Sequence, residues 1–143
     1  MKELGADHLI NYAKTDFVRE LHARYGRPQR RSYDGGVDMV VNYTGGDTWV
    51  PSLRVLKRGG RLMVCGATAG FDPKEDLRYV WSFELKILGS NSWARADLDT
   101  LLGLAATRRL VPVIDRVLPL SEGRKAISLL EDRQVFGKIV VTP

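Results

Sequence analysis

The chain has 143 residues, of which 44% are hydrophobic and 27% are charged, and its formal net charge at pH 7 is +5. This size and composition are typical of a single soluble globular domain with its own core. The positive charge favours anionic ligands in general, without choosing between a nucleotide and a nucleic acid. No apolar run approaches about 18 residues, and no charged and apolar leader follows Met1. The sequence therefore gives no support for membrane insertion or secretion.

Cys65 is the only cysteine of the chain. A single thiol forms no intramolecular disulfide and builds no cysteine-rich zinc site by itself. The chain therefore fits a reducing, cytoplasmic setting. His8 and His22 add no recognisable ligand spacing, so we predict that both are structural or solvated and that the chain holds no metal.

The chain begins with a predicted strand and a predicted helix. Residues 8–12, HLINY, are a short apolar run that suits a strand. In the next segment, apolar side chains recur at helical spacing up to Tyr25. Thr15 or Asp16 is available as the cap of this helix, and Gly26 is its stop signal.

Strands and helices are expected to alternate further along the chain. Residues 37–46 are a nearly continuous apolar run that ends in glycines, as a strand buried on both faces should be. A helix capped by Asp47 is predicted over residues 47–58. Strands are predicted at residues 61–66 and 85–91, with a segment of mixed character between them.

The last third of the chain continues the same alternation. We predict a helix over about residues 97–109, an extended segment at residues 111–120, a helix capped by Ser121 and a last strand at residues 137–142. Strands that alternate with helices indicate an α/β domain with a mainly parallel sheet.

Three of the predicted strands end in loops of small residues. Their sequences are NYTGG at residues 42–46, CGATAG at residues 65–70 and GSNSW at residues 89–93. Ligands of open parallel sheets bind at the carboxyl ends of the strands, where small residues allow close approach to the backbone. Each loop alone is an ordinary strand-to-helix turn, but three in register favour one shared planar ligand.

Several segments together resemble a known family. They are ELGADHLINY (3–12), the long run from GGVDMVV to CGATAG (35–70), LKILGSN (85–91), VIDRVLPL (113–120) and FGKIVV (136–141). In this order they are similar to the later half of the medium-chain dehydrogenases/reductases, in the zinc-type alcohol dehydrogenase and quinone oxidoreductase group. The resemblance covers essentially the whole chain.

The resemblance implies an NAD(P)-dependent oxidoreductase, represented by the C-terminal part of its cofactor-binding domain. The implied fold is a partial Rossmann-like, doubly wound, mainly parallel sheet that lacks its first two strands. Hydride would pass between the nicotinamide and a carbonyl, an alcohol or an activated double bond. Both NAD and NADP are compatible with the resemblance, and NADP is the expected form.

The resemblance also points to residues that border the cofactor. The strand-end loops would lie around the nicotinamide, Tyr12 would lie near the adenosine ribose or its 2′-phosphate, and Lys138 would reach the phosphates. Tyr12 as a half-buried strand-end residue and Lys138 as a solvated residue are the simpler alternatives. The implied loop residues are Asn42, Tyr43, Thr44, Cys65, Gly66, Ala67, Ser90, Asn91 and Ser92.

Some features of the family are not found in this sequence. No G-x-G-x-x-G turn occurs, and the turn that cradles the pyrophosphate in the family would fall before Met1. The separate catalytic domain would fall there too. We therefore predict no catalytic residue in this chain and expect the isolated chain to be inactive.

The two strands that would precede Met1 normally separate residues 8–12 from the strand that begins at Val37, so a gap of roughly 10 Å is expected. Direct pairing of the two flanking strands, filling of the gap by another copy, and excision from a longer enzyme all remain open. At the opposite edge, residues Lys86–Asn91 resemble the strand through which family members dimerise, so a homodimer is expected.

Other interpretations of the chain are weaker. Arg27, Arg30 and Arg31 lie in one loop without aromatic stacking partners, so we predict solvation and no nucleic-acid binding. LKRGGRL (56–62) also resembles class I methyltransferases. A non-catalytic remnant or dimerisation module and a different nucleotide-binding enzyme are therefore kept as alternatives.

Overall fold

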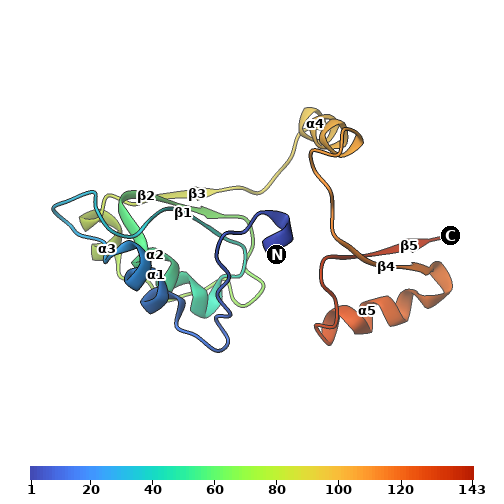
Figure 1. Ribbon diagram of the computed structural model, residues 1–143, viewed down its shortest axis with the longest axis horizontal. Coiled ribbons are helices and arrows are strands. Elements are labelled where there is room, and N and C mark those ends of the chain that lie inside the picture. Colours follow the sequence, from blue (N-terminus) through green and yellow to red (C-terminus); the bar gives the residue numbers. More distant parts are fainter. The chain divides into compact units, whose positions relative to one another are not determined.

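The computed structural model describes all residues, 1–143, as two compact units (Figure 1). The first unit comprises residues 1–91 and the second comprises residues 92–143. The sequence predicts one domain, and the assignment of both units to one domain stays a prediction. No helix in either unit has the length and apolar character needed to cross a membrane.

The first unit is built on a three-stranded parallel sheet. Its strands are β1 (Val37–Asn42), β2 (Leu56–Val64) and β3 (Lys86–Gly89), and their order is β1-β2-β3. Only β2 is paired on both sides, so β1 and β3 each have one free edge. The predicted α/β class with a parallel sheet is confirmed.

Short helices connect these strands. Figure 1 shows α1 and α2 on the same side of the sheet. The Asp16 carboxylate caps α1, because it accepts hydrogen bonds from the backbone N–H groups of Val18 (2.9 Å) and Arg19 (3.2 Å). The helices of this unit are η1 (Lys2–Leu4), α1 (Phe17–Tyr25), η2 (Gly46–Thr48), α2 (Trp49–Arg54) and α3 (Leu77–Ser82).

The core of this unit lies between the sheet and α2. Leu56 and Leu62 of β2 are fully buried, with exposed fractions of 0%. They form one cluster with Leu53, Phe83 and Leu85, so the central strand, α2 and the turn before β3 share the core.

The predicted strand at residues 8–12 is wrong. This segment has no strand structure, and it is separated from β1 by two hollows of about 240 and 580 Å³. Ile10 lines both hollows, opposite Val41 in one and Met39 in the other. A strand exists only when a neighbour satisfies its backbone groups, and β1 pairs with β2 alone. Direct pairing of this segment with β1 is therefore excluded in this structure.

The boundary between α2 and β2 also differs from the prediction. The helix ends at Arg54 rather than near residue 58, and β2 begins at Leu56 rather than at residue 61. The backbone N–H of Val37 donates to the carbonyl of Val55 (2.8 Å), and this early contact draws the chain into the sheet. The segment of mixed character contains α3.

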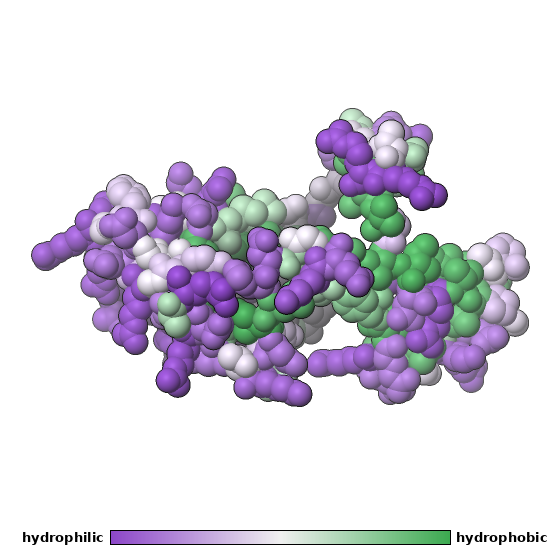
Figure 2. Space-filling model, in the orientation of Figure 1, coloured by the Kyte–Doolittle hydropathy of each residue, from purple (hydrophilic) through white to green (hydrophobic).

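The second unit contains a two-stranded parallel sheet. Ser121 lies in a 3₁₀ turn and caps no helix with its side chain, so that prediction is wrong. Ala126 is the only buried hydrophobic residue of this unit, and Figure 2 shows apolar surface over both strands and α5. The elements are α4 (Arg95–Ala106), β4 (Ile114–Pro119), η3 (Leu120–Glu122), α5 (Gly123–Glu131) and β5 (Lys138–Thr142).

Backbone hydrogen bonds join the loop that follows β1 to the loop that follows β2. The N–H of Ala69 donates to the carbonyl of Thr44 (2.7 Å), and the N–H of Gly46 donates to the carbonyl of Gly70 (2.8 Å). We call these two hydrogen bonds the loop clasp. A Cβ atom on Gly45 would lie 2.4 Å from the Gly70 carbonyl oxygen, so the approach of the two backbones requires glycine there.

A Gly45→Ala substitution is expected to destabilise the first unit by about 1–3 kcal/mol. Alanine is strained at a φ of 68°, and its Cβ atom would push the two loops apart. Gly89→Ala is the control, since no atom lies within 4 Å of the position that its Cβ atom would take. Urea denaturation followed by circular dichroism measures both. Equal midpoints for the two variants would contradict the role of the clasp.

Asp115 is expected to make the second unit sensitive to acid. The backbone N–H of Phe136 donates to its carboxylate (3.1 Å) and Arg116 pairs with it (2.5 Å), which together lower the pKa of Asp115 below its usual 3.8. The contact therefore stabilises the unit above about pH 4 and is lost as the pH falls through the lowered pKa.

This acid-dependent step should be missing in Asp115→Asn, which keeps an acceptor for Phe136 but cannot be protonated in this range. Amide NMR signals of Phe136 followed from about pH 7 to pH 2 report the step. A titration midpoint at or above 3.8, the usual pKa of an aspartate side chain, in the unsubstituted protein would contradict the lowered pKa of Asp115.

Candidate functional site

The carboxyl ends of the three strands of the first unit lie in one row. Asn42 of β1 pairs with Val64 of β2, and Val64 pairs with Gly89 of β3. The loops that begin at Tyr43, Cys65 and Ser90 therefore leave the sheet side by side. This geometry confirms that the three small-residue loops are in register.

Further backbone contacts hold this row together. The N–H of Ser90 donates to the carbonyl of Val64 (2.8 Å), and the N–H of Cys65 is 3.4 Å from the carbonyl of Asn42. With the loop clasp, these contacts join all three loops through main-chain atoms. A ligand at this edge would meet a preformed surface of small residues and backbone groups.

The first loop borders the hollow of about 240 Å³ beside β1. Tyr12, Asn42, Tyr43 and Thr44, four of the predicted cofactor residues, line this hollow together. The side chains of Tyr12 and Tyr43 are well exposed, at 64% and 65%. The structure thus brings Tyr12 to the loop after β1, although residues 8–12 form no strand.

The first two loops also enclose a small apolar hollow of about 210 Å³. Gly66 and Ala67, two more of the predicted residues, line it together with Trp49 and Phe71. The indole N–H of Trp49 donates to Glu75 (2.5 Å), which fixes the ring in the wall. Such a surface suits the flat face of a ring better than a charged group.

Asn42 is the predicted residue whose side chain is most engaged with the protein. It is 5% exposed, and its amide makes four hydrogen bonds within the first unit. Its partners include the side chains of Thr48 and Ser52, which the sequence analysis did not single out. Thr48 ends η2 and Ser52 lies in α2, so their approach to Asn42 depends on the turn after β1, and no local sequence signal marks them.

The remaining predicted residues lie outside these hollows. Cys65 is a free, exposed thiol, and Ser90, Asn91 and Ser92 are exposed after β3. Lys138 is exposed at the start of β5 in the second unit. Contact of each of these residues with a cofactor stays a prediction.

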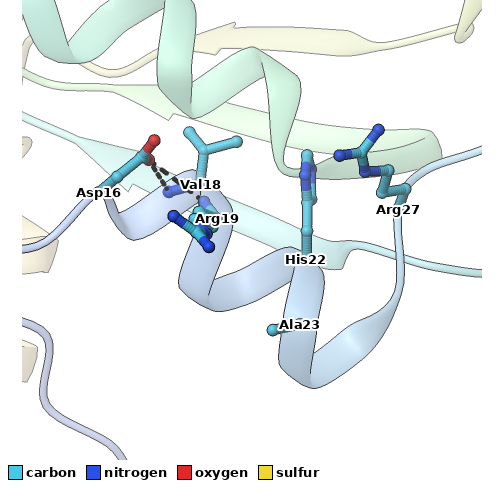
Figure 3. A pocket seen from close by; sticks show the side chains of 6 residues that line it. All are labelled: Asp16, Val18, Arg19, His22, Ala23 and Arg27. Carbon is cyan, nitrogen blue, oxygen red and sulfur yellow. Dashed lines mark hydrogen bonds between the residues drawn. The ribbon is translucent and has the colours of Figure 1, made fainter.

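Another hollow, of about 470 Å³, lies beside α1 (Figure 3). Figure 3 shows Asp16 bonded to the start of the helix and His22 pointing away from it. The His22 ring nitrogen Nε2 lies 3.1 Å from the Arg54 carbonyl and donates to it, which satisfies the end of α2. These groups serve the helix ends, so we do not assign a ligand to this hollow.

The side chains of this chain do not fit a zinc ion. No group of three or more histidine, cysteine, aspartate or glutamate residues is close enough to hold a metal.

Comparison with known proteins places the chain among dehydrogenases. A crotonyl-CoA carboxylase/reductase of Cereibacter sphaeroides is 34% identical over 86 residues, which is 60% of this chain and 20% of that protein. A NAD-dependent alcohol dehydrogenase of Sulfurisphaera tokodaii is 25% identical over 143 residues, covering 99% of this chain and 39% of that protein. The chain thus spans well under half the length of these relatives.

Solved structures of dehydrogenases and reductases also match the fold of this chain. A crystal structure of a NAD-dependent alcohol dehydrogenase matches 99% of this chain and 39% of its own length, with a TM-score of 0.84 and 32% identity. The 2-octenoyl-CoA carboxylase reductase CinF, in complex with NADP and 2-octenoyl-CoA, matches 98% of this chain and 34% of its own, with a TM-score of 0.80 and 27% identity.

The family model for zinc-binding dehydrogenases matches residues 4–141, which is nearly the entire chain. Together with the parallel sheet and the row of small-residue loops, this match shows that the chain belongs to the zinc-binding dehydrogenase family of medium-chain dehydrogenases/reductases.

Proposed function

We propose that this chain forms part of an NAD(P)-dependent oxidoreductase and that the carboxyl edge of β1, β2 and β3 borders the nicotinamide. The observation that carries the proposal is the row formed by Asn42, Val64 and Gly89, from which three small-residue loops leave together. Membership of the dehydrogenase family supports the choice of a nicotinamide cofactor over other planar ligands.

Within this proposal the chain binds and orients the cofactor. Backbone groups of Cys65–Ala67 and Ser90–Ser92 would hold the carboxamide, while Tyr43 and Thr44 would lie against the ring. The apolar hollow lined by Gly66, Ala67 and Trp49 supports this arrangement, because it is shaped by small residues and one fixed aromatic ring. The bound cofactor would supply the hydride.

The other end of the dinucleotide is assigned to Tyr12 and Lys138. Tyr12 would contact the adenosine ribose or its 2′-phosphate, and Lys138 would pair with a phosphate. This proposal for Tyr12 rests on the family resemblance, because the hollow that Tyr12 shares with Tyr43 and Thr44 lies at the loop proposed for the nicotinamide. NADP is the proposed form, since two similar structures contain it, although other relatives are named NAD-dependent.

The proposed substrate of the whole enzyme is an alcohol, a carbonyl compound or an activated double bond. The relatives named above include an alcohol dehydrogenase and a crotonyl-CoA carboxylase/reductase, which cover these classes. We assign no catalytic residue to this chain, and we propose that it is inactive by itself.

The free edge of β3 supports a role in dimerisation as well. Ile87 and Leu88 are 42% and 43% exposed, and the outer backbone groups of this strand have no partner strand. We propose that two copies pair through Lys86–Asn91. A homodimer in the cytoplasm, where the free thiol of Cys65 stays reduced, is the proposed setting.

A titration of isotope-labelled protein with NADPH and with NADH tests the cofactor site. Saturable changes in the amide NMR signals are expected at the three strand-end loops, Tyr43–Gly46, Cys65–Gly70 and Ser90–Ser92. Ala67→Arg should weaken binding about 10-fold or more, because it fills the apolar hollow.

Leu77→Arg is the matched control, since Leu77 is 71% exposed on α3 and does not line that hollow, and it should bind normally. Signal changes confined to the hollow beside α1, or none at millimolar cofactor, would contradict the proposed site.

A further inference from the structure

The side chain of Asn42 uses all of its hydrogen-bonding capacity inside the first unit. Its Oδ1 atom accepts from the backbone N–H groups of Thr44 (2.9 Å) and Gly45 (2.8 Å). Its Nδ2 group donates to the hydroxyls of Thr48 (3.1 Å) and Ser52 (3.0 Å). An amide offers two donors and two acceptor positions, so nothing is left over for a ligand.

The direction of every bond in this network is fixed. The Thr48 hydroxyl donates to the carbonyl of Gly45 (2.7 Å), and the Ser52 hydroxyl donates to the carbonyl of Thr48 (2.7 Å). Each hydroxyl has a single hydrogen, so both can only accept from Asn42. The position therefore needs a side chain that donates on one side and accepts on the other.

The network holds Gly45 on both sides, through the peptide group before it and the peptide group after it. The N–H of Gly45 bonds to Asn42, and its carbonyl bonds to Thr48, which is itself bonded to Asn42. Thr44 and Gly46, the neighbours of Gly45 in the chain, are the residues that bond to Ala69 and Gly70 in the loop clasp. The side chain of Asn42 thus sets the first loop directly and the second loop through the clasp.

We infer that Asn42 is a positioning residue that fixes the two cofactor-side loops before any ligand binds. The claim that ordered loops favour cofactor binding rests on the proposed function, whereas the order of the loops is a property of the chain itself. A loop fixed in advance costs less ordering entropy when a ligand arrives.

Asn42→Asp is the decisive substitution because it changes one donor group and almost no volume. The carboxylate still accepts from Thr44 and Gly45, but its second oxygen faces two hydroxyl oxygens in a buried site. If the Thr48 hydroxyl turns to donate to this oxygen, the carbonyl of Gly45 loses its partner. Either way the loop loses one side of its support.

Amide hydrogen exchange without cofactor measures the effect on the loops. In Asn42→Asp, exchange at Ala69 and Gly46, the two donors of the clasp, should accelerate about 10-fold or more. The amide of Gly59, which bonds to the carbonyl of Phe83 (2.8 Å) at the far end of the sheet, is the internal reference and should change little. Unchanged exchange at Ala69 and Gly46, or an equal rise at Gly59, would overturn the inference.

Asn11→Asp is the matched control. Asn11 is exposed, and its side chain only accepts, from the N–H of Ala13 (3.1 Å), so a carboxylate does the same there. A second pair keeps the test decisive if Asn42→Asp fails to fold. Thr48→Val, which removes the hydroxyl, should loosen the clasp, whereas Thr48→Ser, which keeps it, should not. Equal exchange in these two variants would also overturn the inference.

Cofactor binding is then a separate readout. If NADPH binds the chain, Asn42→Asp and Thr48→Val should weaken it several-fold, and Thr48→Ser should restore it. If the loops loosen but the affinity for NADPH stays unchanged, the claim that ordered loops favour cofactor binding is overturned. If no cofactor binds at all, the proposed function fails, while the exchange experiment still decides whether Asn42 orders the loops.

Discussion

The structure of the first unit depends on β2, which is the only strand with a partner on both sides. Leu56 and Leu62 on its inner face are fully buried, and they form one cluster with Leu53 of α2 and with Phe83 and Leu85 before β3. Its parallel register with β1 and β3 also brings the three strand ends into one row. The same pairing therefore supplies both the core and the candidate site, so the site cannot shift without a change in the register.

Much of this arrangement could be predicted from local sequence signals. Asp16 and Gly26 bound α1 as expected, because a capping carboxylate and a glycine act through their immediate neighbours. The strand at Val37 was also visible from its apolar run. The prediction of a strand at residues 8–12 failed because the apolar pattern describes only what the segment can bury. A strand also needs a partner strand at hydrogen-bonding distance. That requirement is not local.

The candidate site likewise depends partly on local sequence signals and partly on contacts that are not local. The small residues of the three loops marked the carboxyl edge in advance, since glycine and serine at strand ends are a local signal. The role of Asn42 could not be predicted, because it depends on a turn that brings Thr48 and Ser52 back to the end of β1. Spacings of six and ten residues have no meaning until that turn is formed. The early start of β2 was hidden for a related reason, since Gly59 and Gly60 interrupt the apolar pattern but lie inside the strand.

The two ends of the proposed ligand place different demands on the protein, and this chain meets them unequally. A nicotinamide ring needs small residues and oriented backbone groups, which the clasp, the Asn42 network and the fixed Trp49 ring form from residues 42–75 alone. A pyrophosphate needs a glycine-rich turn at a helix start, for which the sequence has no motif. Beside β1, where the family's strand order places that turn, the structure instead has hollows and half-exposed Met39 and Val41. On the proposed function, the chain is therefore preorganised for the reactive end of the cofactor, while most of the binding energy of the phosphates has to come from groups other than the strand-end loops.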